Sequence, residues 1–288
     1  MKKLFTPIDK ETGGSGTNML KDRIASSVIV LTLASLVIFL FPNWVFCAVT
    51  AWFIGMALYE FYSMVERKNV KVYKYFGTLL GILVPVVTYL EYDMKTEGMV
   101  PFSLVLFALF IFARQFTKKD DANILTSTAI TLFGILYISW FFSFIIKLKY
   151  LANGANIVLF LIILTEGGDA GAYFAGSAMG KHLLIPRISP KKTVEGTLGG
   201  FLFTLVLSIL CKPLMPEFSY WRLLVAGILI GTITPIGDLA ESLFKRDCGA
   251  KDSGSCLPGL GGVLDMVDSL LLTSPMLYFY ITTFGNNF

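Results

Sequence analysis

The sequence predicts an all-α, polytopic integral membrane protein with about nine transmembrane helices and a cytoplasmic N terminus. Of its 288 residues, 55% are hydrophobic and only 15% are charged, whereas about 25% of the residues of a soluble domain are charged. Apolar runs long enough to cross a bilayer recur along the whole chain, and the mean hydropathy is +0.70. Soluble enzymes and nucleic-acid-binding proteins are therefore excluded, and membrane lipids are the expected surroundings.

The chain divides into a polar start and a series of apolar runs. Residues 1–18 are polar and glycine-containing, and we expect a leader segment or a disordered tail there. The first five helices are expected within 19–150 and the last four within 151–288. The expected spans are 24–41, 44–61, 76–92, 99–116, 124–146, 154–176, 197–215, 221–244 and 262–284.

The distribution of basic residues predicts the orientation. When the loops are assigned alternately to the two sides, sixteen Lys and Arg residues after the polar start fall on one side and five on the other. Basic residues near helix ends are retained in the cytoplasm. The N terminus and the three longest polar loops, at 62–75, 177–193 and 245–261, are thus predicted to be cytoplasmic, and the tyrosines of the first loop are expected at the membrane interface.

Acidic residues occur inside three of the predicted spans, where an ionisable side chain costs roughly 2.5–3.5 kcal/mol and so needs a partner or a function. They form three pairs with i, i+3 spacing, which places each pair on one helix face. Three such faces can converge on one polar chamber near the cytoplasmic helix ends. The pairs are Glu166 and Asp169, Asp238 and Glu241, and Asp265 and Asp268.

Basic and glycine-rich stretches flank these acidic spans. Carboxylates hold divalent metals while Lys and Arg neutralise phosphate oxygens, so the combination is typical of a magnesium–phosphate site. Membrane orientation also explains basic loops, and a single carboxylate near a helix end can simply reach the interface. The only histidine, His182, and the cysteine spacing give no sign of a zinc site.

A longer pattern in the C-terminal region carries a family resemblance. The stretch from Ser242 to Asp268 contains S-x-x-K-R, then K-D, then P-x-x-G-G and finally D-x-x-D. Upstream, the chain contains G-D-x-x-E-S from Gly237, S-P-K-K-T-x-E-G over 189–196, and D-x-G-A-Y over 169–173. These motifs, in this order, resemble the phosphatidate cytidylyltransferases. The first five spans resemble the family only in their general apolar character. Leu260 and Met266 replace a His and an Arg of the family pattern.

The resemblance implies an Mg²⁺-dependent nucleotidyltransferase of the cell inner (cytoplasmic) membrane, with its active site facing the cytosol. CTP and phosphatidic acid would react to give CDP-diacylglycerol and pyrophosphate, and the number of carboxylates leaves room for a second cation. A homodimer is a further expectation. The implied metal ligands are Asp238, Asp265 and Asp268, which with Lys192 form the catalytic set; the implied substrate-binding residues are Lys191, Lys192, Lys245, Arg246, Lys251, Asp252, Asp169 and Glu241.

Two other functions stay open. A CTP-dependent polyprenol or phytol kinase would also bind a metal and a triphosphate, but the motifs from Ser242 to Asp268 argue against it. A cation-coupled transporter would also place carboxylates in the membrane. Its site would lie nearer the midplane and would not require paired basic loops.

Overall fold

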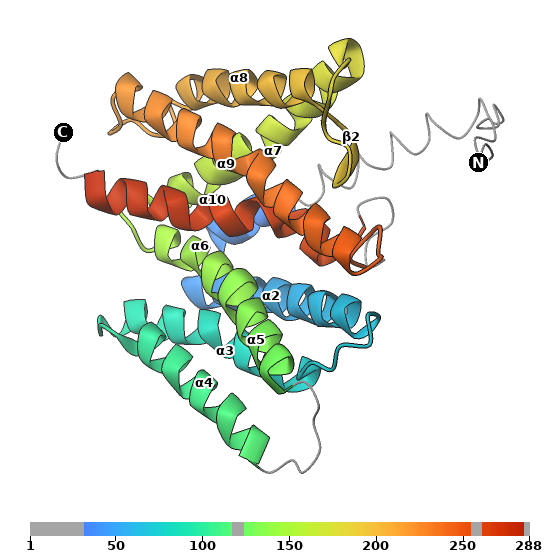
Figure 1. Cartoon of the computed structure of the whole chain (residues 1–288). Coiled ribbons are helices and arrows are strands. Elements are labelled where there is room, and N and C mark those ends of the chain that lie inside the picture. Colours follow the sequence, from blue (N-terminus) through green and yellow to red (C-terminus); the bar gives the residue numbers. More distant parts are fainter. Residues whose placement is uncertain (1–31, 117–123, 255–260, 285–288) are drawn as a thin grey trace, which may run out of the picture.

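The computed structural model describes residues 32–116, 124–254 and 261–284 (Figure 1). Residues 32–40 are helical, and a helical bundle follows them. Its elements are α2 (Asn43–Glu66), α3 (Lys74–Asp93), α4 (Met99–Phe116), α5 (Ile124–Gly134), the π-helix η1 (Ile135–Trp140), α6 (Phe141–Lys149), α7 (Gly154–Met179), β1 (Leu183–Ile185), β2 (Ser189–Thr193), α8 (Val194–Leu210), α9 (Tyr220–Asp247) and α10 (Val263–Phe284).

The expected spans from 44–61 onward each coincide with a helix, and α5, η1 and α6 together form the helix expected at 124–146. Five helices of the described residues are long and apolar enough to cross a membrane, and α4 and α8 contain shorter apolar stretches. A helical membrane protein is therefore confirmed. The segment 1–18, and residues 24–31 of the span expected at 24–41, lie outside the described residues. The five long apolar helices are Asn43–Glu66, Lys74–Asp93, Ile124–Lys149, Gly154–Met179 and Tyr220–Asp247.

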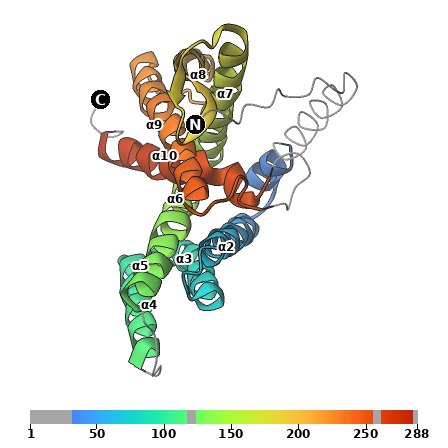
Figure 2. The same cartoon turned by 45° about the vertical axis from the view of Figure 1, so that its right-hand side comes forward.

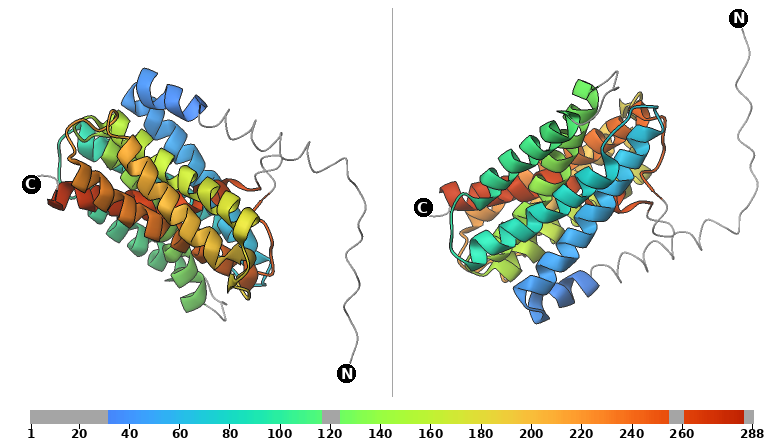
Figure 3. Two further views of the ribbon diagram at one scale, coloured as in Figure 1. Left: turned by 90° about the horizontal axis from the view of Figure 1, so that it is seen from above. Right: turned by 90° about the horizontal axis from the view of Figure 1, so that it is seen from below.

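Helix α10 lies in the middle of the bundle (Figures 1 and 2). It packs against α9 and α7 on one side and against α6 and α2 on the other. Helix α4 lies at the edge and contacts α3 and α5. The helices run in roughly one common direction, as expected for a bundle that spans a bilayer (Figure 3). The last helix therefore joins the two halves of the chain.

Helices α7 and α8 pack closely because glycines face each other across their contact. A Cβ on Gly168 would lie 2.5 Å from Thr204 Oγ1, and one on Gly200 would lie 2.7 Å from the Gly168 carbonyl oxygen. Small residues of this kind let membrane helices approach each other closely. The close approach brings the C-terminal part of α7 next to strand β2 and the start of α8.

Contacts between described connections join loops at each end of the bundle. At one end, Lys68 forms a 2.6 Å ion pair with Asp247, which joins the α2–α3 loop to the end of α9. The α6–α7 and α8–α9 connections meet at the other end, where Asn153 Nδ2 donates to Glu217 Oε1 at 2.8 Å. These contacts place the basic loops at 67–74 and 245–251 together.

Two local details differ from the expectations. The loop predicted at 177–193 contains the short antiparallel hairpin of β1 and β2, within an otherwise helical fold. The polar loop expected from residue 62 begins later, because α2 continues to Glu66. Tyr62 is consequently buried rather than interfacial, and its hydroxyl donates to the Thr131 carbonyl oxygen at 2.7 Å.

Candidate active site

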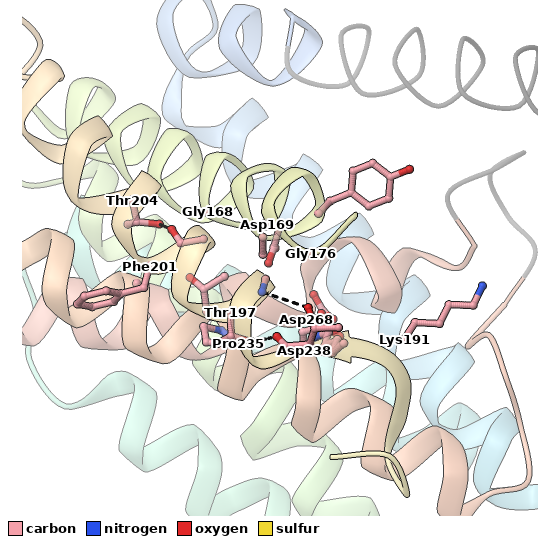
Figure 4. A pocket seen from close by; sticks show the side chains of 18 of the residues that line it. Gly168, Asp169, Gly176, Lys191, Thr197, Phe201, Thr204, Pro235, Asp238 and Asp268 are labelled. Carbon is pink, nitrogen blue, oxygen red and sulfur yellow. Dashed lines mark hydrogen bonds and ion pairs between the residues drawn. The ribbon is translucent and has the colours of Figure 1, made fainter. Parts of the chain in front are cut away.

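A cavity of about 530 Å³ opens between the C-terminal helices, at the end of the bundle that carries the basic loops. Its walls come from α7, β2, α8, α9 and α10, all of them elements of the C-terminal half of the chain (Figure 4). Small and apolar residues of α8 and α9, among them Gly200, Phe201, Thr204 and Gly231, form one part of the wall. Charged residues form the other part.

Four predicted carboxylates line this cavity: Asp169 from α7, Asp238 from α9, and Asp265 and Asp268 from α10. Asp268 is only 9% exposed. Ser269 helps to join the walls, because its hydroxyl lies 3.4 Å from both Asp169 Oδ2 and the Thr234 carbonyl oxygen. Acidic faces of three helices thus converge here, with one cavity-lining carboxylate each from α7 and α9 and two from α10.

Lysines lie between these carboxylates. Lys192 forms an ion pair with Asp238. Lys245 Nζ lies 2.6 Å from Asp265 Oδ1 and also pairs with Glu241, which is completely buried beside the cavity. Burial lowers the pKa of Lys192, while the carboxylates of Asp268 and Asp169 act in the opposite direction. The site therefore holds opposite charges side by side in a partly desolvated space.

Asp265 is held by several donors at the start of α10. Its Oδ2 accepts from Gly262 N at 2.7 Å, from Ser253 N at 3.0 Å and from Ser253 Oγ at 2.8 Å. A carboxylate in the first helical turn satisfies N–H groups that have no partner within the helix. Because Oδ2 is occupied in this way, Oδ1 is the oxygen that faces Lys245 and the cavity.

One buried carboxylate next to this site comes from the N-terminal half of the chain and was not among the predicted site residues. Glu60 of α2 is 6% exposed and accepts hydrogen bonds from Val263 N and Leu264 N at 3.1 and 2.9 Å. A single Glu in the apolar run 44–61 was the available signal. Nothing in the local pattern indicates that its donors lie about two hundred residues further along the chain.

The donor set suits a divalent cation, because Asp238, Asp265 and Asp268 present carboxylate oxygens, the ligands that Mg²⁺ prefers, on adjoining walls of one cavity. Among the described residues, no group of three or more His, Cys, Asp or Glu side chains has the geometry of an assembled metal site. Lys192 and Lys245 pair with two of these three carboxylates instead. A metal would therefore share these carboxylates with the lysines or displace the lysines from them.

Other predicted residues are not gathered into the site. Lys191 borders the cavity, but its side chain points away from the carboxylates (Figure 4). Arg246 is exposed and donates from Nε to the Ile188 carbonyl oxygen of the hairpin at 3.2 Å. Lys251 and Asp252 are exposed and do not line the cavity, and Glu166 is exposed on α7.

Of the two positions that depart from the family pattern, Met266 is described by the structure and does not line the cavity. Met266 is partly buried and packs against the apolar core. Leu260 lies outside the described residues. At position 266, the side chain is therefore directed at the packing of α10 and not at a phosphate site.

Comparison with known proteins gives concordant similarities. A profile of the Cytidylyltransferase family matches residues 21–284. The phosphatidate cytidylyltransferase of Bacillus subtilis is 31% identical over 80% of this chain and 86% of its own length. The protein of the same name from Haemophilus influenzae is 28% identical over 91% of this chain and 99% of its own length. The Escherichia coli K12 protein named uncharacterized protein YnbB is 38% identical, and the match spans half of its length.

Proposed function

The chain belongs to the cytidylyltransferase family, and from this membership we propose that it is a phosphatidate cytidylyltransferase. It transfers the CMP group of CTP to phosphatidic acid, which gives CDP-diacylglycerol and pyrophosphate. The observation that carries the proposal is the alternation of Lys192 and Lys245 with Asp238 and Asp265 in one cavity at a bundle end. Such a site suits a soluble triphosphate that meets a lipid phosphate.

The reaction needs little acid–base chemistry, because the phosphate of phosphatidic acid is already an anionic nucleophile. A lipid phosphate oxygen attacks the α-phosphorus of CTP, a new P–O bond forms there, and the bond from the α-phosphorus to the bridging oxygen of the pyrophosphate breaks. Lys192 and Lys245 supply positive charge where negative charge accumulates on the leaving group. The protein thus contributes alignment and charge stabilisation.

We assign Asp238, Asp265 and Asp268 as the residues that would hold Mg²⁺. When bound, the metal would neutralise the triphosphate oxygens alongside the lysines. Asp169, on the α7 wall, is the carboxylate left for the second cation that the sequence allows. Titration with EDTA followed by readdition of Mg²⁺ tests this assignment: activity should fall and then return.

The proposal includes nine membrane spans, a cytoplasmic N terminus and a site that faces the cytosol of a bacterial inner membrane. It is supported by the grouping of basic loops at the end where the cavity opens. A homodimer is part of the same proposal, and light scattering of the detergent-solubilised protein tests it. The expected mass is that of two chains.

The deciding experiment follows two phosphorus labels. Purified protein in mixed micelles receives phosphatidic acid, Mg²⁺ and CTP labelled at either the α- or the γ-phosphate. We expect the α-label to enter lipid and the γ-label to appear in pyrophosphate, because attack occurs at the α-phosphorus. Binding of CTP alone does not discriminate, since a kinase would bind it too.

The other outcomes point to the two alternatives. A γ-label in lipid, with release of CDP, identifies a lipid kinase and refutes the cytidylyltransferase assignment. A folded protein that transfers neither label makes the cation-coupled transporter the hypothesis to test. Glu66→Ala, an exposed change near the end of α2, serves as a control that retains α-label transfer.

A further inference from the structure

Glu60 links the N-terminal half of the chain to the start of α10. It lies on α2, six residues before the helix ends at Glu66, and its carboxylate is almost completely buried. In the part of the chain that the structure describes, neutral groups donate hydrogen bonds to it: Val263 N, Leu264 N and Ser253 Oγ at 3.1, 2.9 and 3.1 Å. A buried carboxylate is therefore held by N–H and O–H groups of a segment distant in sequence.

These donors include the first two N–H groups of α10, which have no acceptor within the helix. A carboxylate at this place also interacts favourably with the positive end of the helix dipole. A capping residue normally precedes its own helix, but here the acceptor comes from another helix across the bundle. Glu60 thus fixes the position of the α10 start relative to α2.

Ser253 connects Glu60 to the candidate active site. Its hydroxyl lies 3.1 Å from Glu60 Oε2 and 2.8 Å from Asp265 Oδ2. The hydroxyl has one proton, which it can donate to one carboxylate at a time, so Glu60 and Asp265 share this donor. A displacement of Glu60 would therefore change the hydrogen bonding of Asp265, the carboxylate that faces Lys245.

Two glycines leave the space that this arrangement needs. A Cβ on Gly254 would collide with Glu60 Oε1, and a Cβ on Gly262 would collide with Ser253 Oγ and Glu60 Oε2. The absence of side chains at these positions lets the backbone close around the carboxylate. The contact with Glu60 therefore depends on glycine at both positions, next to Ser253 and to the start of α10.

We propose that Glu60 is a positioning residue for the transferase reaction. It holds the start of α10 so that Asp265 keeps one oxygen on Ser253 and Gly262 and presents the other to the cavity. This inference rests on the proposed function, because Asp265 is assigned there to the metal. Glu60 itself does not line the cavity and does not touch the reacting groups.

The test compares Glu60→Ala and Glu60→Gln with wild type and with Glu66→Ala. Glu66 is a matched control, because it is a glutamate of the same helix with a half-exposed side chain. For each protein we measure kcat, the KM for CTP and the Mg²⁺ concentration that gives half-maximal α-label transfer. We expect Glu60→Ala to raise that Mg²⁺ concentration roughly tenfold, as fits the loss of hydrogen bonds to a charged acceptor.

Glu60→Gln should have a smaller effect, because the amide keeps the side-chain shape and one acceptor oxygen. Excess Mg²⁺ should partly restore kcat in both variants. If both Glu60 variants are folded and keep the wild-type Mg²⁺ dependence, the positioning role is refuted. A lower melting temperature with an unchanged Mg²⁺ dependence likewise overturns it, because Glu60 would then serve stability alone.

A second measurement does not depend on turnover. Hydrogen exchange of a peptide covering 261–268 should be roughly tenfold faster in Glu60→Ala than in wild type or Glu66→Ala. Unchanged exchange there refutes the inference even if the protein proves to be a kinase or a transporter. Absence of α-label transfer in wild type, together with faster exchange in the variant, would instead refute the proposed function and retain the anchoring of α10.

Discussion

Replacement of Lys245 by methionine should separate its structural role from its proposed role at the triphosphate. Lys245 is 14% exposed and pairs with Glu241, which is completely buried, and with Asp265, which is 12% exposed. Methionine keeps much of the side-chain volume but removes the charge. The change therefore leaves two neighbouring carboxylates without their common cation.

The expected cost is large because one partner of a buried ion pair is removed while the other stays charged. Such changes cost about 3–5 kcal/mol of unfolding free energy. Glu241→Gln alone should cost less than about 2 kcal/mol, because Lys245 keeps Asp265 as its partner. The double variant should be more stable than Lys245→Met, with a coupling energy of about 2–3 kcal/mol.

Unfolding free energies are measured by titrating the protein in dodecylmaltoside micelles with SDS, and activity is measured by α-label transfer. The double variant should fold well and remain inactive, since the positive charge proposed for the leaving pyrophosphate is still absent. A loss below about 1 kcal/mol for Lys245→Met, the value of a surface ion pair, would refute the reasoning. So would a double variant that is no more stable than the single one.

Three further changes test other parts of the structure. Asp265→Asn should abolish Mg²⁺-dependent turnover and lower the unfolding free energy by about 1–3 kcal/mol, because an amide group replaces one acceptor oxygen. If the variant is folded and keeps most of its activity, Asp265 is not one of the metal ligands. Gly200→Val should destabilise the protein by about 1–3 kcal/mol, since its Cβ would press on the Gly168 carbonyl of α7, and an unchanged melting curve contradicts that close approach. Single cysteines at Lys71 and Glu97, in a background without native cysteines, should react with an impermeant maleimide from opposite sides of the membrane; labelling from one side only contradicts the alternating spans.

The helices could be predicted well from the sequence because lipid requires long apolar runs with internally satisfied backbones. The helix from Ile124 to Lys149 illustrates both the success and its limit. Its bounds lie close to the predicted 124–146. The π-helical turn at Ile135–Trp140 could not be predicted, because its residues are as apolar as the rest of the helix and the hydropathy pattern does not change there. The hairpin was missed for a related reason, since S-P-K-K resembles an ordinary basic loop.

The candidate site could be predicted where charge stood out against an apolar background. Asp238 and Asp265 lie together as expected, because ionisable groups in membrane helices face the bundle interior and pair there, and Lys192 reaches them from strand β2. Glu166 and Asp169 show the limit of spacing. Residues three apart differ by about 60° around a helix, so Asp169 lines the cavity while Glu166 is exposed and does not line it.

The contact between α2 and α10 also bears on how the protein is made. Glu60 leaves the ribosome about two hundred residues before Val263 and Leu264, which donate to it in the finished protein. At a synthesis rate of about 5–20 residues per second, this corresponds to a wait of roughly 10–40 s. During that time, the carboxylate near the end of α2 lacks the donors of α10 and must be solvated in another way at the membrane surface. The cavity is complete only when α10 has joined the other helices, so a nascent chain cannot begin turnover before α10 has been synthesised.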